Sequence, residues 1–502
     1  MSEKKIGAIL SFIIIFLKIG ITFLYIPFVL DKIGKDSYGL FAIVSSVIAY
    51  IAILDFGIND STLRYFVKYR KESSEKIKIN ILGSVSSIYS IIGILVVIAS
   101  VIVYFCIELL FSNTFSIQEL ILFKKMYVIS AVSIFFTVFF NPVGAILNAY
   151  EKFIVLKVTD ILVFIATTIT IVFFLNTGYG VVEMVLISAI FNIGSIIFKY
   201  SYVISKYKIR YPTYKPSKIY LKEIVLYAGP IFIVVIIEQI YWKLDNIIIG
   251  ATIGATMVTY YAMGIVFQKY ILSFATAISR IMTPDLIKSI DLNNSINSLT
   301  NNYIKTSRIQ LIVVLLIILN LIFWGKSFLI IWIGEEYIIS YYVLLLIMIP
   351  FSLEIIGNLR NTFLQVYGYY WQRAIVILFV SLLNVVLTII LVKKFGVIGA
   401  AASTCLGLFL GYGITNYILW KKVGIDIKKF FKEVWLKSLM PIIITAFVWY
   451  VTSLFIQVDS WFKLILAVGI TSIVYVITMG FLYLTALEKA TFINLYNRKK
   501  LK

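Results

Sequence analysis

Four ionisable side chains lie near the middle of long apolar stretches of this sequence: Lys18, Glu238, Lys269 and Glu354. An ionisable group inside a membrane-spanning helix is costly and usually faces a polar interior. Lys18 and Lys269 lie too deep in their stretches for their stems to reach the lipid headgroups easily. We therefore expect a cationic cavity, which would suit an anionic substrate such as a phosphate or a diphosphate.

The apolar stretch that contains Glu238 also carries polar residues at helical spacing. Glu238, Tyr241, Trp242 and Asp245 fall at i, i+3, i+4 and i+7, so they share one face of a helix. Such a face can line a water-filled path. Because burial favours the protonated form of a carboxyl group, a proton or ion gradient could act through Glu238 or Glu354, with Asp245 as the next candidate.

A purely structural role competes with this functional one. Lys243 and Arg360 lie near the ends of their apolar stretches, where their stems can extend to the headgroups. Alternatively, acidic and basic side chains pair between helices and only hold the bundle together. In that case transport would be downhill and drawn by polymerisation of the product outside.

Composition argues against several kinds of catalytic site. The chain has no histidine, which removes a Ser-His-Asp triad and histidine metal ligands. Its two cysteines, Cys106 and Cys405, stand alone in apolar stretches and imply neither a disulfide framework nor a metal cluster. The sequence has no G-x-x-x-x-G-K-[ST] nucleotide loop. We predict a transporter rather than an enzyme, with no catalytic residue, metal or cofactor.

Membrane-spanning helices must position these side chains. Hydrophobic residues make up 61% of the 502 residues and charged residues 14%, whereas a soluble domain is nearer half apolar and a quarter charged. The excess comes in blocks of about 20 residues, the length that a helix needs to cross the hydrocarbon layer. Because backbone groups must be paired in lipid and the alternation of a membrane barrel is absent, the predicted fold is an all-α polytopic bundle. Its fourteen predicted spans are 6–30, 39–63, 80–111, 121–149, 158–176, 181–204, 224–250, 257–282, 308–332, 341–366, 374–392, 397–420, 438–456 and 461–485.

The basic residues predict the orientation of these spans. With the amino terminus inside, the inside segments hold 33 of the 45 Lys and Arg residues and the outside segments hold 8. Since cytoplasmic loops are enriched in Lys and Arg, we expect both termini on the cytoplasmic side of a cell membrane. The net charge of +21 then reflects cations that face anionic membrane lipids, and not a nucleic-acid surface.

An internal repeat divides the predicted bundle. Residues 147–152 and 364–369 are similar and are offset by 217, and Gly180 and Gly396 are offset by 216. Two such matches at nearly one offset indicate two parallel six-helix halves with a substrate between them, although apolar sequences also align by chance. The predicted parts are an N-terminal lobe, 1–222, a C-terminal lobe, 223–437, and an additional helix pair with a cytoplasmic tail, 438–502.

Proline and glycine mark candidate hinges in corresponding spans of the two halves. Pro27 lies in the first span, and Gly229 and Pro230 lie in the seventh. Proline removes a backbone hydrogen bond and allows a helix to bend, so these sites could gate alternating access. A kink without a function is the competing interpretation.

Several short motifs resemble those of a known family. Residues 33–41, with Tyr38-Gly39, residues 54–58, Leu-Asp-Phe-Gly-Ile, and residues 63–66, with Arg64, resemble the first two spans of Wzx-type oligosaccharide flippases. These belong to the multidrug/oligosaccharidyl-lipid/polysaccharide exporter superfamily. Leu364-Gln365 and the Gly-x-x-Gly-Ala-Ala motif at 396–401 also look familial. Each motif is weak alone, and their order and spacing carry the resemblance over most of the chain.

This resemblance implies a V-shaped bundle that moves undecaprenyl-diphosphate-linked oligosaccharide from the inner to the outer leaflet for cell-surface polysaccharide export, such as that of O-antigen or capsule. The additional helix pair is similar to that of the lipid II flippases, where it holds the lipid tail. The implied partners are membrane lipids, the lipid-linked oligosaccharide, a polysaccharide polymerase and export machinery. A positively charged lumen is common in the family, and we extend that expectation to six residues: Lys18, Lys269, Lys243, Arg64, Arg280 and Arg360.

Two other functions remain open at this stage. A multidrug cation antiporter of the same superfamily would be favoured by twelve spans and an acidic cavity. A polytopic glycosyltransferase or polymerase would need a sizeable outside loop for glycosyl chemistry, and the predicted outside loops are short.

Overall fold

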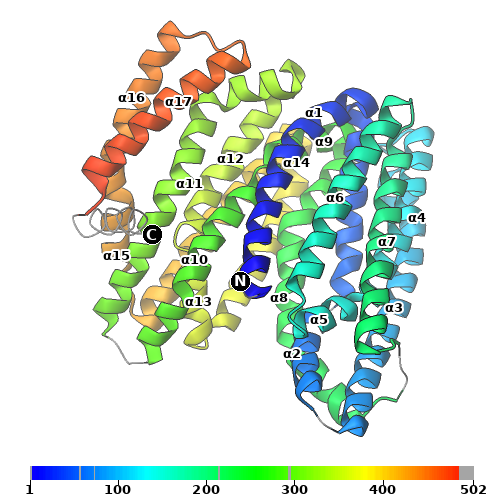
Figure 1. Cartoon of the computed structure of the whole chain (residues 1–502). Helices are drawn as coiled ribbons and strands as arrows, with labels where there is room; N and C mark the ends of the chain where they lie inside the picture. The colour runs from blue at the N-terminus through cyan, green and yellow to red at the C-terminus, as the bar shows by residue number, and fades with distance from the viewer. Residues whose placement is uncertain (1–2, 56–57, 73, 213–214, 292–294, 486–502) are drawn as a thin grey trace. The chain divides into compact units, whose positions relative to one another are not determined.

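Helices make up the regular structure of this chain. The computed structural model describes residues 3–55, 58–72, 74–212, 215–291 and 295–485 (Figure 1). Within these ranges there is no β-strand. The predicted all-α membrane bundle is therefore confirmed as a fold class.

The described chain forms two compact units. Unit 1 comprises residues 1–262 and 385–400, and unit 2 comprises residues 263–384 and 401–502. The helices before the boundary at residue 262 are α1 (Glu3–Ala52), α2 (Ile58–Lys71), α3 (Glu75–Phe111), α4 (Ile117–Phe139), α5 (Asn141–Ala149), α6 (Phe153–Asn176), α7 (Val181–Tyr207), α8 (Lys218–Ile253) and α9 (Ala255–Ile265), the last of which runs across it. After the boundary come α10 (Gln268–Asp291), α11 (Ile296–Ile333), α12 (Ile338–Ile355), α13 (Leu359–Val366), α14 (Tyr370–Ile418), α15 (Ile427–Phe430), α16 (Leu439–Phe455) and α17 (Trp461–Thr478). The predicted division at 222 and 437 concerns the repeat, and it stays a prediction.

The long apolar helices are the candidate membrane spans. Eleven segments of the described chain are long and apolar enough to cross a bilayer. Two of them, Ile13–Asp55 and Tyr370–Val423, are longer than one crossing needs. Each contains a kink at a glycine with positive φ, Gly34 at 76° and Gly396 at 59°, so each covers two of the spans predicted from the sequence. The total of fourteen spans stays a prediction.

Helix bounds recur at the offset of the sequence repeat. The predicted fourth span is broken between α4 and α5, and the predicted tenth span is broken between α12 and α13. Proline at position 142 favours a new helix start at the first break, because its missing N–H would be unpaired in a first turn anyway. Helices α5 and α13 end 217 residues apart, at Ala149 and Val366. Each is followed by a left-handed residue, Glu151 or Gly368, again 217 apart.

In unit 2, the last two long helices pack on α11 (Figure 1). The ring of Trp449 on α16 stacks on Phe323 at 4.9 Å, and its indole N–H donates to the Phe323 carbonyl at 3.1 Å. From α17, Thr471 donates to the Asn320 side chain at 3.0 Å and accepts from Trp324 at 3.3 Å. Because hydrogen bonds are directional, these polar contacts fix the orientation of α16 and α17 on α11 in addition to the packing of apolar surface.

Candidate functional site

The two deepest predicted lysines are both exposed. In unit 1, the Lys18 ammonium lies 5.5 Å from the ring centroid of Phe164, which α6 contributes. In unit 2, the Lys269 ammonium lies 5.0 Å from the ring of Tyr270. Each cation therefore has an aromatic neighbour and is otherwise exposed. A cavity shared by the two lysines stays a prediction.

A second cationic feature joins α2 and α8 within unit 1. The Arg64 guanidinium lies 5.0 Å from the ring centroid of Tyr227, and the Lys68 ammonium lies 5.1 Å from that of Tyr220. Arg64 was predicted as a site residue, whereas the other three were not. Sequence alone pairs these residues poorly, because more than 150 positions separate each cation from its tyrosine.

Asp245 is the best defined of the predicted coupling carboxylates. It lies on α8 with only 3% of its surface exposed. The Tyr261 hydroxyl donates to its Oδ2 at 2.5 Å, and the Thr388 hydroxyl donates to its Oδ1 at 3.2 Å. All three residues belong to unit 1. A buried carboxylate held by hydroxyl donors can exchange a proton or help to hold a cation, because hydroxyl and carboxylate oxygens are hard ligands.

The other residues of this predicted polar face are less clearly defined. Tyr241 and Trp242 place their rings 4.7 Å apart and nearly perpendicular. Lys243 is partly buried. The side chain of Glu238 lies outside the described part of the structure, so its coupling role stays a prediction.

Unit 2 brings two predicted residues together in one ion pair. The Arg360 guanidinium lies 2.6 Å from the Glu354 carboxylate, and the arginine side chain has no exposed surface while the glutamate retains 25%. Arg360 also donates to the Asn416 side-chain oxygen at 3.3 Å and lies 5.1 Å from the Tyr412 ring. The sequence had assigned the arginine to substrate binding and the glutamate to ion coupling. Their pairing supports the structural alternative for both residues.

This ion pair bridges the break between α12 and α13. Gly357, at φ 95°, donates its N–H to the Gln310 side chain at 3.0 Å and accepts from the Tyr303 hydroxyl at 3.2 Å. Two residues of α11 thus satisfy backbone groups that the broken helix leaves free. Specific tertiary contacts within unit 2 therefore stabilise the break, which is not a frayed helix end.

The remaining predicted residues occupy ordinary positions. Arg280 is exposed on α10. Pro27 lies inside α1, and the non-helical backbone of that helix is at Gly34. Gly229 lies within α8, and a Cβ added there would meet no other atom within 4 Å. The Pro230 side chain lies outside the described part, and the hinge role of these positions stays a prediction.

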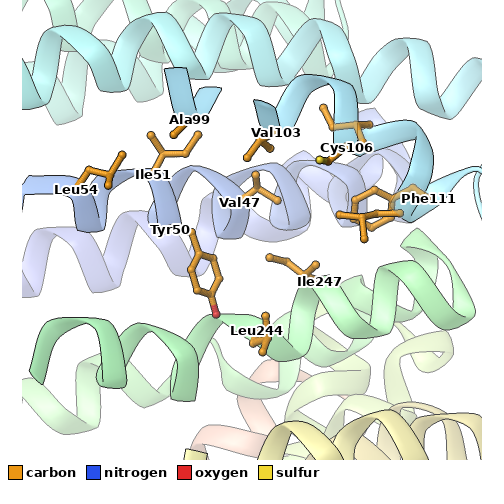
Figure 2. A pocket seen from close by; sticks show the side chains of 12 residues that line it. Val47, Tyr50, Ile51, Leu54, Ala99, Val103, Cys106, Phe111, Leu244 and Ile247 are labelled. Atoms are coloured by element: carbon orange, nitrogen blue, oxygen red, sulfur yellow. The ribbon is translucent and has the colours of Figure 1, made fainter. Parts of the chain in front are cut away.

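Unit 1 also contains an apolar cavity that the sequence did not reveal. It measures about 340 Å³ and is lined by side chains of α1, α3 and α8, among them Val47, Cys106 and Ile247 (Figure 2). Tyr50 contributes the polar edge, and its hydroxyl donates to the Gln239 carbonyl at 3.2 Å. Cys106 was the only sequence signal here, as a lone thiol in an apolar stretch. Among the described residues, no group of three or more His, Cys, Asp or Glu could hold a metal ion.

Comparison with known proteins places this helical architecture in a family. Residues 5–284, more than half of the chain, match the family model described as "Polysaccharide biosynthesis protein". The chain belongs to this family. No curated protein matches it.

Solved structures share the fold of this polysaccharide biosynthesis family member. A structure titled "Lipid II flippase MurJ, inward closed conformation" is 21% identical with a TM-score of 0.70, covering 99% of this chain and 100% of its own. An inward-facing multidrug resistance MATE family transporter of the MOP superfamily is 15% identical with a TM-score of 0.65, covering 82% and 95%. A MOP superfamily transporter from Pyrococcus furiosus, whose title reports a reversed polarity of the binding pocket, is 18% identical with a TM-score of 0.56, covering 86% and 97%.

Family and fold agree with the sequence-based resemblance. The matched family concerns polysaccharide biosynthesis, and the solved structures with this fold are named as flippases and transporters. The resemblance to the exporter superfamily is therefore confirmed at the level of family and fold. The chain belongs to the polysaccharide biosynthesis family and shares its fold with structures that are named as flippases and transporters.

Proposed function

We propose that this protein flips undecaprenyl-diphosphate-linked oligosaccharide from the inner to the outer leaflet of the cell membrane, for export of cell-surface polysaccharide. One observation carries this choice among the superfamily's functions. The family description names polysaccharide biosynthesis, and the fold match to a lipid II flippase extends over 99% of the chain, whereas the MATE match extends over 82%. The additional helices α16 and α17 are fixed firmly on α11, as a structural part of the transporter.

The charged residues support an anionic substrate. Lys18 and Lys269 are exposed within apolar helices, and Arg64 and Arg280 are exposed as well. These cations would hold the diphosphate by charge and by hydrogen bonds. The buried Arg360 contributes to this task only if its pair with Glu354 opens.

Coupling to an ion gradient is assigned to Asp245. Its hydroxyl donors, Tyr261 and Thr388, come from α9 and α14. Protonation of the carboxyl group, or binding of a cation to it, changes the hydrogen bonds that join these helices to α8. Such a change is a local event that can bias a two-state bundle. Glu238 and Glu354 stay secondary candidates.

The orientation follows from the basic bias, with both termini cytoplasmic, so the substrate is taken up on the side that carries the basic segments. Partners in this role are a polymerase and export machinery on the outer side. A multidrug cation antiporter is the second candidate, because MATE transporters share the fold. The exposed basic side chains near the predicted midplane oppose it.

The test is a flipping assay in reconstituted vesicles. Undecaprenyl diphosphate N-acetylglucosamine with a fluorescent label on the sugar should lose its label to a membrane-impermeant reagent only as it reaches the outer leaflet. Vesicles with the protein should show faster exposure than empty vesicles. If they instead export ethidium and leave the labelled lipid in place, the antiporter is the correct function.

A further inference from the structure

Two cation–aromatic pairs form a row across α2 and α8. Arg64 and Lys68 are four residues apart on α2, and Tyr220 and Tyr227 are seven residues apart on α8. Both spacings place side chains on one face of a helix. The ring distances of 5.0 Å and 5.1 Å show that each cation lies over one tyrosine. We call these four residues the α2–α8 strip.

Hydrogen bonds between the two pairs hold the strip in place. The Tyr65 hydroxyl donates to the Glu223 carboxylate at 2.7 Å, and the buried Ser61 hydroxyl donates to the Ile224 carbonyl at 3.3 Å. Burial, together with the bond to Glu223, raises the pKa of Tyr65 to about 12, so its hydroxyl remains a donor at any physiological pH. The strip is therefore preorganised, which lowers the entropic cost of binding a ligand.

The charges of the strip are available to a ligand. Arg64, Lys68 and Tyr227 are exposed, and neither cation forms an ion pair within the described chain. Glu223 is the acidic side chain nearest in sequence to Tyr220 and Tyr227, and it is engaged by Tyr65. A guanidinium and an ammonium one helical turn apart match the two phosphates of a diphosphate. The tyrosine rings beside them offer flat amphipathic faces against which a sugar ring can pack.

We propose that the α2–α8 strip binds the diphosphate and the adjoining sugar of the lipid-linked substrate. This inference rests on the proposed function and adds the residues that recognise the junction between phosphate and sugar. By the basic bias, α2 and the start of α8 face the cytoplasm, where the substrate is made. The strip is thus a loading site, distinct in sequence from the deeper Lys18.

A membrane-interface role would use the same residue types. Lysine, arginine and tyrosine also gather where helices leave the bilayer, and there they contact the phosphates of ordinary phospholipids. The two roles share phosphate recognition but differ in their need for the tyrosine ring beside the cation. A sugar diphosphate needs both the ring and the charge, whereas a phospholipid headgroup needs the charge alone.

The test measures binding by the full-length protein in phosphatidylcholine nanodiscs. The probes are undecaprenyl diphosphate N-acetylglucosamine, undecaprenyl diphosphate without sugar, and phosphatidylglycerol. Tyr227→Ala should weaken binding of the first probe at least about tenfold, equivalent to about 1.4 kcal/mol, and leave the second within about twofold. Arg64→Ala should weaken both undecaprenyl probes. Tyr227→Phe keeps the ring and should bind like the unchanged protein, as should Lys71→Ala, which removes an exposed cation of α2 outside the strip.

The outcomes separate this inference from the proposed function. If the unchanged protein binds no undecaprenyl probe, the proposed function fails and the strip loses its ligand with it. Equal binding of the sugar probe by Tyr227→Ala, Arg64→Ala and the unchanged protein overturns the strip alone. If Tyr227→Ala and Arg64→Ala lose phosphatidylglycerol binding but still bind the sugar probe like the unchanged protein, the strip belongs to the membrane interface. That result also overturns the inference.

Discussion

Arg360 and Glu354 form an ion pair across a break in a helix, with 2.6 Å between the guanidinium and the carboxylate. The arginine is completely buried while the glutamate is one quarter exposed. Removing a charge from its partner inside a protein leaves the other charge uncompensated, which costs more than the pair contributes in net terms. Because separating the two charges would be costly, the ion pair stabilises the break between α12 and α13.

The first prediction follows from this relationship. Glu354→Gln should destabilise the protein by about 3–5 kcal/mol, because it leaves Arg360 charged and buried. A double variant, Glu354→Leu with Arg360→Met, should recover part of that loss. Thermal unfolding in detergent measures both effects. Lys463→Gln is the matched control, since the exposed pair of Lys463 with Asp459 should contribute almost nothing. Equal stability of Glu354→Gln and the unchanged protein would contradict the structural assignment of this pair.

The second prediction concerns coupling at Asp245. Asp245→Asn keeps the size of the side chain but removes its charge, so flipping in vesicles should lose its response to an imposed pH or sodium gradient. Tyr261→Phe removes one donor and should shift the gradient response rather than abolish it. Ser46→Ala provides the control, because Ser46 bonds to the neighbouring Asn246 at 2.9 Å and not to the carboxylate. Flipping by the unchanged protein that ignores both gradients would leave Asp245 as a structural group.

The third prediction concerns the attachment of the additional helix pair. Arg308 on α11 is 2% exposed and donates to the Glu433 carbonyl at 2.8 Å and to the Tyr483 carbonyl. Both carbonyls lie in π-helical turns, where the backbone ladder is irregular. Arg308→Met should therefore loosen the start of α16 and the end of α17 and lower the melting temperature. Faster amide hydrogen exchange in Arg308→Met, confined to residues 431–438 and 479–483, is the expected signature. A uniform increase in exchange over the chain would contradict it.

Thr471→Val removes a hydrogen bond between apolar helices of the same pair and α11. It should lower the free energy of unfolding by about 0.6 kcal/mol.

The fourth prediction tests topology. In a Cys106→Ser, Cys405→Ser background, cysteine at Ser112 or Ser460 should react with an impermeant thiol reagent in intact cells. Cysteine at Ser74 or Ser217 should react only after the membrane is permeabilised. Reaction of the Ser217 variant in intact cells would reverse the orientation and place the α2–α8 strip outside.

Much of the fold was predictable because lipid leaves a chain few choices. Apolar blocks of about 20 residues must be helical, and the observed helices largely cover the predicted spans, although α11 begins twelve residues before its span. The breaks between α4 and α5, between α9 and α10 and between α12 and α13 were missed. At Gly357 the break depends on Tyr303 and Gln310, which lie about 50 residues earlier, so no local pattern announces it.

The site was predictable in its residue types and not in its pairings. The sequence identified Asp245 and Arg360 as unusual, because ionisable residues are costly in apolar helices. Their partners depend on tertiary structure: Thr388 is 143 residues from Asp245, and Asn416 is 56 residues from Arg360. The tyrosines of the α2–α8 strip carried no sequence signal, since tyrosine is abundant throughout this chain.

The left-handed turn after the broken helix occurs twice, once with Gly368 and once with Glu151. A non-glycine residue in this conformation costs about 1–2 kcal/mol, and here the glutamate side chain lies 3.5 Å from Arg70. If the predicted internal repeat holds, these two turns are corresponding positions of the two halves. One half then has the residue that the geometry favours, and the other has glutamate beside a cation. Each half would in that case be a template for stabilising the other, beginning with Glu151→Gly.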